Sequence, residues 1–136
     1  MTDSNFTIGF IGLGLIGGSI AKGIRRVFPN YTLIGMDENP DTIKSALEDG
    51  IIDSIATDCK TDFAECNYVF LCAPVQYNVM YLKDLKASIN ENCILTDVGS
   101  VKEEIHLKIE ELGMEEYFIG GHPMVGSEKA GFFFQF

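Results

Sequence analysis

At 136 residues the chain is long enough for one domain with a hydrophobic core and too short for two. Hydrophobic residues make up 46% of it, which excludes a disordered chain, and its net charge of −10 argues against a nucleic-acid-binding surface. No apolar run reaches the roughly 18 residues of a membrane span. Four cysteines without C-x-x-C spacing predict reduced thiols in a cytoplasmic protein, and no metal site.

Short β-rich runs alternate with amphipathic helical patterns along the chain, which is typical of a parallel sheet with crossover helices. In chain order, strands are predicted at 7–11, 31–36, 68–72, 93–96 and 117–119. Apolar residues at helical spacing predict the buried faces of three helices: Ile16, Ile20, Ile24 and Val27; Val79, Leu82, Leu85 and Ile89; Val101, Ile105, Ile109 and Leu112. A further helix begins at the cap Asn39-Pro40 and ends near residue 49. The predicted fold is α/β, a Rossmann-type, doubly wound, mainly parallel sheet with helices on both faces.

The run GLGLIG at 12–17 fits the G-x-G-x-x-G pattern of a dinucleotide-binding loop, and it lies between a predicted strand and a predicted helix. Gly12 permits the tight turn, Gly14 lets the backbone approach a pyrophosphate, and Gly17 permits close packing of helix and strand. The free N–H groups of the new helix, which starts around Leu15 and Ile16, favour the negative charge of a phosphate.

Asp37 lies 20 residues beyond Gly17, at the end of the second predicted strand. A carboxylate at this place hydrogen-bonds the ribose hydroxyls of the adenosine half. Glu38, Asn39 and Pro40 follow it, with no arginine to neutralise a 2′-phosphate, so NAD is favoured over NADP as the cofactor. The alternative is a turn residue at the end of a strand.

Ala73, Pro74 and Val75 follow the apolar run at 68–72. In a doubly wound sheet, ligands bind outside the carboxyl ends of the strands, so we expect these three residues to border the cofactor. A simple strand-terminating proline is the alternative interpretation.

Ser100 and His122 are the candidate groups for chemistry. Ser100 starts a predicted helix, where it can cap Glu103 in an S-x-x-E box, contact the nicotinamide or substrate, or do both. His122 lies in a glycine-flanked loop after the last predicted strand, beside the expected nicotinamide. An imidazole has a pKa suited to taking the proton of a hydroxyl group while a hydride leaves the carbon that bears this hydroxyl. The alternative is a structural role, which is the usual one for a lone histidine.

Four segments together resemble the prephenate dehydrogenase family, including its arogenate-using relatives: GLGLIGGS at 12–19, Asp37, TDVGSVK at 96–102 and GGHPMVGSEKAG at 120–131. The resemblance covers almost the whole chain from Thr7 to Gly131, and the histidine-containing segment is quite specific to that family. It implies that His122 is the catalytic histidine and that Ser100 contacts both that histidine and the substrate region. It also implies that Glu128 lies near the entrance of the substrate pocket.

The reaction implied by the resemblance is the NAD-dependent oxidative decarboxylation of prephenate to 4-hydroxyphenylpyruvate, on the route to tyrosine. The substrate would be prephenate or arogenate, which the sequence does not separate. Aromatisation drives such a reaction, so the protein chiefly aligns the substrate and accepts a proton. Family members form homodimers through a second, largely helical domain, which also supplies cations for the substrate carboxylates.

The resemblance further predicts the domain organisation. Residues 1–131 form the dinucleotide-binding domain, and residues 132–136 begin the helical domain, which is missing. Arg25 and Arg26 lie far from the predicted site, so Lys102 and Lys129 are left as point charges for a carboxylate, and the isolated chain is expected to be weakly active or inactive. A non-catalytic dinucleotide-binding module and another dehydrogenase, of the β-hydroxyacid or imine-reducing type, are the alternatives.

Overall fold

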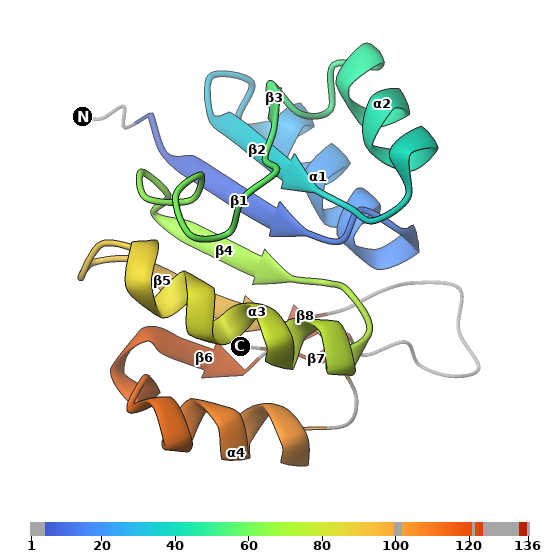
Figure 1. Ribbon diagram of the computed structural model, residues 1–136. Coiled ribbons are helices and arrows are strands. Elements are labelled where there is room, and N and C mark those ends of the chain that lie inside the picture. The colour runs from blue at the N-terminus through green and yellow to red at the C-terminus, as the bar shows by residue number, and fades with distance from the viewer. Residues whose placement is uncertain (1–4, 100–101, 121, 124–133, 136) are drawn as a thin grey trace.

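The sheet is doubly wound and parallel, as the sequence predicted. The structure is a computed structural model that describes residues 5–99, 102–120, 122–123 and 134–135. Its larger sheet has six parallel strands in the order β3-β2-β1-β4-β5-β6 (Figure 1). The strands are β1 (Thr7–Ile11), β2 (Thr32–Met36), β3 (Ser54–Ile55), β4 (Tyr68–Leu71), β5 (Ile94–Asp97) and β6 (Phe118–Gly120). The short β3 was not located from the sequence, because its two exposed residues carry no apolar pattern.

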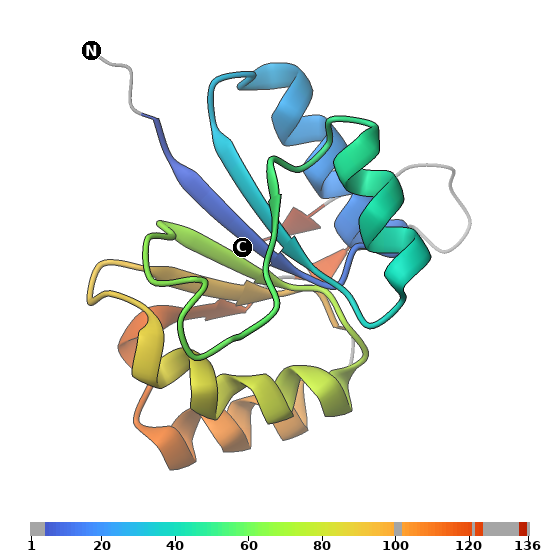
Figure 2. The ribbon, with the colours of Figure 1, turned by 45° about the horizontal axis from the view of Figure 1, so that its top comes forward.

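Helices cover both faces of this sheet (Figure 2). On one face lie α1 (Leu15–Val27) and α2 (Pro40–Glu48), and on the other lie α3 (Val75–Ser88) and α4 (Glu103–Leu112). Within the described ranges, no helix is long and apolar enough to cross a membrane. A 3-10 turn at Glu115–Tyr117 leads from α4 into β6, and β7 (His122–Pro123) pairs antiparallel with β8 (Phe134–Gln135).

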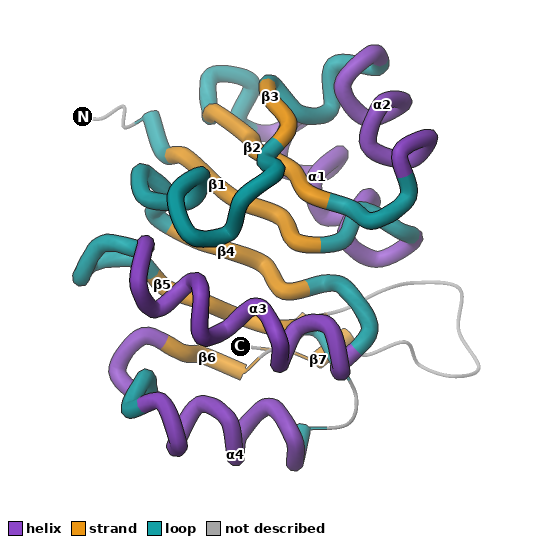
Figure 3. Tube along the Cα trace, viewed as in Figure 1, coloured by secondary structure: helices purple, strands orange, loops and turns teal. Residues whose placement is uncertain are grey.

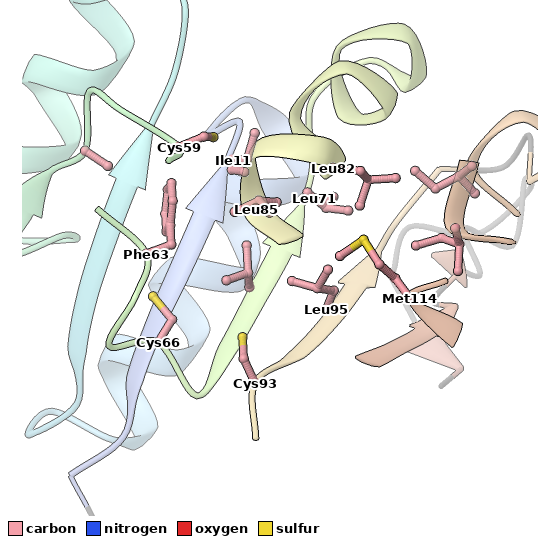
Figure 4. Packing of buried hydrophobic residues seen from close by; sticks show 14 residues of the cluster. Ile11, Cys59, Phe63, Cys66, Leu71, Leu82, Leu85, Cys93, Leu95 and Met114 are labelled. Atoms are coloured by element: carbon pink, nitrogen blue, oxygen red, sulfur yellow. The ribbon is translucent and has the colours of Figure 1, made fainter. Parts of the chain in front are cut away.

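The two faces hold separate hydrophobic clusters. Under α1 and α2, buried residues such as Phe10, Leu33 and Ile43 pack together, and Phe10 stacks on Phe70 with 5.3 Å between ring centroids. Under α3 and α4, Leu82 and Leu85 pack against the sheet (Figure 4). The connection from β3 to β4 contains no helix (Figure 3), yet it closes this second core with buried side chains. These are Ala56, Cys59, Phe63 and Cys66.

The buried face of α1 differs from the prediction at one position. Gly17 and Ala21 are its fully buried residues, Ile20 and Ile24 are half-buried, and Val27 is 62% exposed. Small residues let this helix lie close to the strands, so its contact line runs through them instead of through the larger apolar side chains. Val27 was therefore wrongly placed in the core.

The predicted start of α2 and the predicted end of α4 are confirmed, but the predicted start of α4 is wrong. This helix begins at Glu103 with Lys102 as its N-cap, so Glu103 is its first residue and not the third, as the S-x-x-E box expected from Ser100 requires. The Asn39 side chain accepts hydrogen bonds from the backbone N–H groups of Asp41 and Thr42, and Pro40 occupies the first turn of α2. Gly113 closes α4 in the left-handed conformation, with φ of 67°. Because both faces of the sheet are covered, the loops at the carboxyl ends of its strands are left to form a ligand site. The arrowheads of β1, β2 and β4 in Figure 1 mark that edge.

Candidate active site at the carboxyl edge of the sheet

The glycine loop links β1 to α1 and leaves no room for larger residues at two of its positions. Gly12 has φ of +96°, and a Cβ there would lie 2.6 Å from the backbone nitrogen of Ala73. A Cβ on Gly17 would overlap the carbonyl oxygen of Gly12 and lie 2.9 Å from the Cβ of Cys72. The tight turn and the close helix–strand packing predicted for these two glycines are both present.

Gly14 differs from its neighbours, because a Cβ there would meet no atom within 4 Å. It is the N-cap of α1, makes no side-chain capping hydrogen bond, and is followed by a first turn without an acidic residue. The N–H groups of that turn therefore face outward with the positive end of the helix dipole behind them. This open helix start can accept an anionic group.

Asp37 sits just beyond β2 and holds the glycine loop. Its Oδ2 accepts a hydrogen bond of 2.7 Å from the backbone N–H of Leu13, and its Oδ1 accepts one of 2.8 Å from that of Asn39. The turn role considered for this residue is therefore real. Each carboxylate oxygen retains a second lone-pair direction, so these bonds leave capacity for a ligand hydroxyl.

A cleft of about 250 Å³ opens between these loops. It brings together five of the predicted cofactor-binding residues: Gly12, Gly14, Asp37, Ala73 and Pro74. Of the other five, Ser100 lies outside the described residues, and Leu15, Ile16, Gly17 and Val75 are not among the residues that line the cleft. The side chain of Leu15 is 77% exposed, and Leu15 instead lines a second, more open groove between α1 and α2.

Several residues that line the cleft were not predicted from the sequence. Tyr77 and Tyr81, one helical turn apart on α3, form part of the wall, as does Glu38. The spacing of four residues between Tyr77 and Tyr81, just after Pro74, places both on one face of a helix and could have indicated that they line the site. Burial, and secondarily the nearby Glu38 carboxylate, raises the pKa of the Tyr81 hydroxyl. That hydroxyl is therefore a neutral hydrogen-bonding group at physiological pH.

Cys72 also lines the cleft but is not suited to nucleophilic chemistry. Burial, and secondarily the negative charge of Asp97, raises the pKa of its thiol to about 12, which keeps it protonated. In the described ranges all four cysteines are free, and no group of three potential ligands could hold a metal ion.

Asn78 is a buried polar residue of α3 that the sequence did not single out. Its Nδ2 donates to the carbonyl oxygen of Ala73 at 2.9 Å and to that of Leu71 at 3.4 Å. Its Oδ1 is buried without a hydrogen-bond partner among the residues the structure describes. The amide thus ties α3 to the end of β4, and fixes the turn that borders the cleft.

The residues predicted for catalysis fall mostly outside the described part. Ser100 and Glu128 lie in the segments 100–101 and 124–133, and of His122 only the backbone is placed, in β7. Val101 and Lys129 are outside it too. What is described at this end is Asp97, whose side chain is 2% exposed and whose Oδ1 lies 2.7 Å from Nζ of Lys102.

Two of the cations weighed as carboxylate anchors are already engaged. Lys102, which the sequence left as a point charge for a carboxylate, is the partner of Asp97. Arg25 pairs with Asp53 at 2.7 Å and also donates to backbone carbonyls, among them that of Tyr31. Tyr31 precedes β2, so Arg25 is at the opposite edge of the sheet, as predicted.

Comparison with known proteins gives consistent matches. A sequence model described as the prephenate dehydrogenase nucleotide-binding domain matches residues 20–134. The prephenate dehydrogenase of Bacillus subtilis (strain 168) is 37% identical over 133 residues, which are 96% of this chain and 36% of that protein. A prephenate dehydrogenase from A. aeolicus, solved in complex with hydroxyphenyl propionate and NAD+, superposes with a TM-score of 0.81 and 34% identity, covering 96% of this chain and 46% of that one.

The Synechocystis arogenate dehydrogenase is similar as well, with a TM-score of 0.76 and 36% identity over 87% of this chain and 41% of that one. This chain therefore spans less than half the length of each of these relatives.

Proposed function

The chain belongs to the prephenate dehydrogenase family, and we propose that it is the NAD-binding and proton-accepting half of an enzyme that oxidatively decarboxylates prephenate or arogenate. The observation that carries this proposal is the cleft at the carboxyl edge of the sheet, where Gly12, Gly14 and Asp37 meet. The A. aeolicus relative was solved with NAD+ and an aromatic acid, which agrees with both halves of the proposal.

The chain's own residues fit the adenosine and pyrophosphate parts of NAD. The uncapped start of α1 and the open face of Gly14 would receive the pyrophosphate. Asp37, already oriented by two backbone N–H groups, would accept hydrogen bonds from the ribose hydroxyls. Ala73 and Pro74 would border the cofactor from the β4 side. The cofactor, once bound, supplies a hydride acceptor.

Two carboxylates at the end of β2 support NAD over NADP. Asp37 and Glu38 both line the cleft, and the next two residues are Asn39 and Pro40. A 2′-phosphate placed there would face negative charge instead of a guanidinium.

The catalytic assignment follows the family resemblance. His122 would accept the proton of the ring hydroxyl while the hydride leaves the ring carbon that bears this hydroxyl. Ser100 would orient that histidine, and Glu128 would lie at the entrance of the substrate pocket. The departing carboxylate leaves as CO₂, its bonding electrons complete the aromatic ring, and the proton returns to the phenolic oxygen of the product. The protein then contributes alignment and one proton-accepting group.

The domain assignment remains part of the proposal. Residues 1–131 would be the nucleotide-binding domain, and 132–136, of which Phe134–Gln135 pair as β8 with β7, would lead into a helical domain that forms the homodimer and supplies cations for the substrate carboxylates. The engagement of Arg25 and Lys102 in ion pairs supports the need for such cations. We therefore expect the 136-residue chain to bind NAD and to turn over prephenate weakly or not at all.

Calorimetric titration tests the cofactor part. We expect NAD+ to bind and NADP+ to bind at least tenfold more weakly, because its 2′-phosphate would meet the charge of Asp37. NADP+ binding as tight as NAD+ binding would contradict the role of Asp37. Rapid prephenate-dependent formation of NADH by this chain would contradict the need for a second domain. If the chain binds NAD but no longer form of the protein catalyses the reaction, a non-catalytic module would be favoured.

A further inference from the structure

Asp97 holds two residues of the turn that follows β5. Its Oδ1 forms the ion pair with Lys102 at the start of α4, and its Oδ2 accepts a hydrogen bond of 3.3 Å from the backbone N–H of Gly99. Only 1% of the residue is exposed, so both oxygens are committed inside the protein. One buried carboxylate thus fixes the chain shortly after β5 ends and again where α4 begins.

This turn does not line the cleft itself, but it follows the strand next to β4, whose carboxyl end borders the cleft on the side away from Asp37. The carboxyl ends of β2, β1, β4 and β5 follow one another along the sheet, so the ends of β2 and β5 are three strand spacings, or about 14 Å, apart. A dinucleotide whose adenosine ribose binds Asp37 crosses the glycine loop and ends over β4 and β5. Its nicotinamide half is then the part beside the turn held by Asp97.

The end of β5 is also coupled directly to the cleft wall. The backbone N–H of Val98 donates to the carbonyl oxygen of Leu71 at 3.3 Å, immediately before Cys72 and Ala73, which line the cleft. The charge of Asp97 acts on the thiol of Cys72 as well. A change at Asp97 therefore reaches the β4 side of the site through one hydrogen bond.

We propose that Asp97 is a positioning residue for the nicotinamide half of the cofactor, acting through Gly99 and Lys102 without touching the ligand itself. This inference rests on the proposed binding of NAD in the cleft. A buried ion pair is weak evidence for stability, because desolvation offsets much of the attraction, whereas removing one partner leaves an uncompensated charge. Its value here is the fixed geometry it imposes on the turn.

The Arg25–Asp53 pair provides a matched control. Its separation is also 2.7 Å, but it lies at the amino edge of the sheet, where Arg25 holds the carbonyls of Pro29, Tyr31 and Ile51. A purely structural pair should affect stability alone when it is broken. A positioning pair should affect one half of the cofactor more than the other.

The test compares NAD+ with ADP-ribose, which lacks the nicotinamide, by calorimetric titration of the 136-residue chain. In Asp97→Asn we expect the Kd of NAD+ to rise about tenfold and that of ADP-ribose to change less than about twofold, in line with the loss of a charge-assisted hydrogen bond. Lys102→Gln breaks the same ion pair from its other side and should show the same selectivity if the first variant does not fold. Arg25→Gln should lower the midpoint of thermal unfolding and leave both Kd values within about twofold.

Equal weakening of the two ligands in the folded variants, or no weakening of either, would overturn the positioning role. Binding of neither ligand to the unsubstituted chain would refute the cofactor proposal itself, and this inference would fall with it. The two failures are distinguished by the unsubstituted chain alone.

Discussion

The two sides of the cleft are built by opposite means. On the β1 and β2 side, shape comes from missing side chains: Gly12 and Gly17 let backbone segments touch, and Gly14 leaves the helix start open. On the β4 side and at the neighbouring end of β5, the turns are held by buried polar side chains, Asn78 and Asp97, that form hydrogen bonds to the turn backbone. The first side is therefore sensitive to added atoms, and the second to lost donors and acceptors.

The largest effect should come from adding one methyl group on the glycine side. Gly17→Ala places a Cβ against the carbonyl oxygen of Gly12 and near Cys72, so helix and strand must separate. We expect a loss of about 3 kcal/mol in the free energy of unfolding, measured by urea denaturation. Gly23→Ala on the same helix is the matched control, because its Cβ would meet nothing within 4 Å, and it should stabilise by roughly 0.5–1 kcal/mol. A gain in stability at both positions would show that helix propensity and not packing governs α1.

The next effect is on the polar side. Asn78→Asp keeps the shape of the side chain but replaces its donating amide with a carboxylate that faces the carbonyls of Leu71 and Ala73. We expect a loss of about 2 kcal/mol in the free energy of unfolding at neutral pH, because a buried charge gains no donor. Asn78→Leu, which loses the hydrogen bonds without adding charge, should cost less. If the leucine variant were the less stable of the two, the shape of the side chain at this position, and not its hydrogen bonds, would determine the stability.

Asp37 belongs to both descriptions, since it is a polar side chain on the glycine side. Asp37→Asn leaves one acceptor oxygen for the two N–H groups of Leu13 and Asn39, so one of these hydrogen bonds is lost, and it removes the charge facing the ligand. We expect the Kd of NAD+ to rise about tenfold and the ratio of the Kd of NADP+ to that of NAD+ to fall, both measured by calorimetry. Asp49→Asn, which removes an exposed charge that does not line the cleft, is the control. An unchanged preference would place the discrimination at Glu38 or elsewhere.

This contrast explains how much the sequence could reveal. On the glycine side, the tight turn at Gly12 and the close packing at Gly17 were predicted, because such backbone contacts need glycine at set spacings within one short segment. Leu15 and Ile16, also predicted to bind the cofactor, do not line the cleft. The doubly wound, parallel sheet with helices on both faces followed from the alternation of strand and helix patterns, whereas β3 was not located. Asn78 and the Asp97–Lys102 pair were not predicted, because a lone asparagine in a helix and a strand-end aspartate have ordinary local explanations. Their roles depend on contacts with the carbonyls of β4 and with the start of α4, which appear only once the chain is folded.

The core shows the same limit in another form. The apolar spacing located α3 and α4 correctly, since Leu82, Leu85, Ile105 and Ile109 are all buried. In α1 the spacing of large apolar residues placed Val27 in the core, whereas the helix packs through Gly17 and Ala21. Hydrophobic periodicity finds the face of a helix that rests on large side chains and misplaces one that rests on small ones.

Gly14→Ala should separate folding from binding more cleanly than any other change on the glycine side. No atom of the described protein lies within 4 Å of the added Cβ, so the free energy of unfolding should change by less than about 0.5 kcal/mol. If the pyrophosphate approaches this backbone, however, the same methyl group meets the ligand, and the Kd of NAD+ should rise about fivefold by calorimetry. Adenosine, which has no pyrophosphate, should bind both forms equally and serves as the ligand control. An unchanged Kd for NAD+ would mean that the pyrophosphate passes elsewhere, and that the glycine at 14 serves neither the fold nor the cofactor.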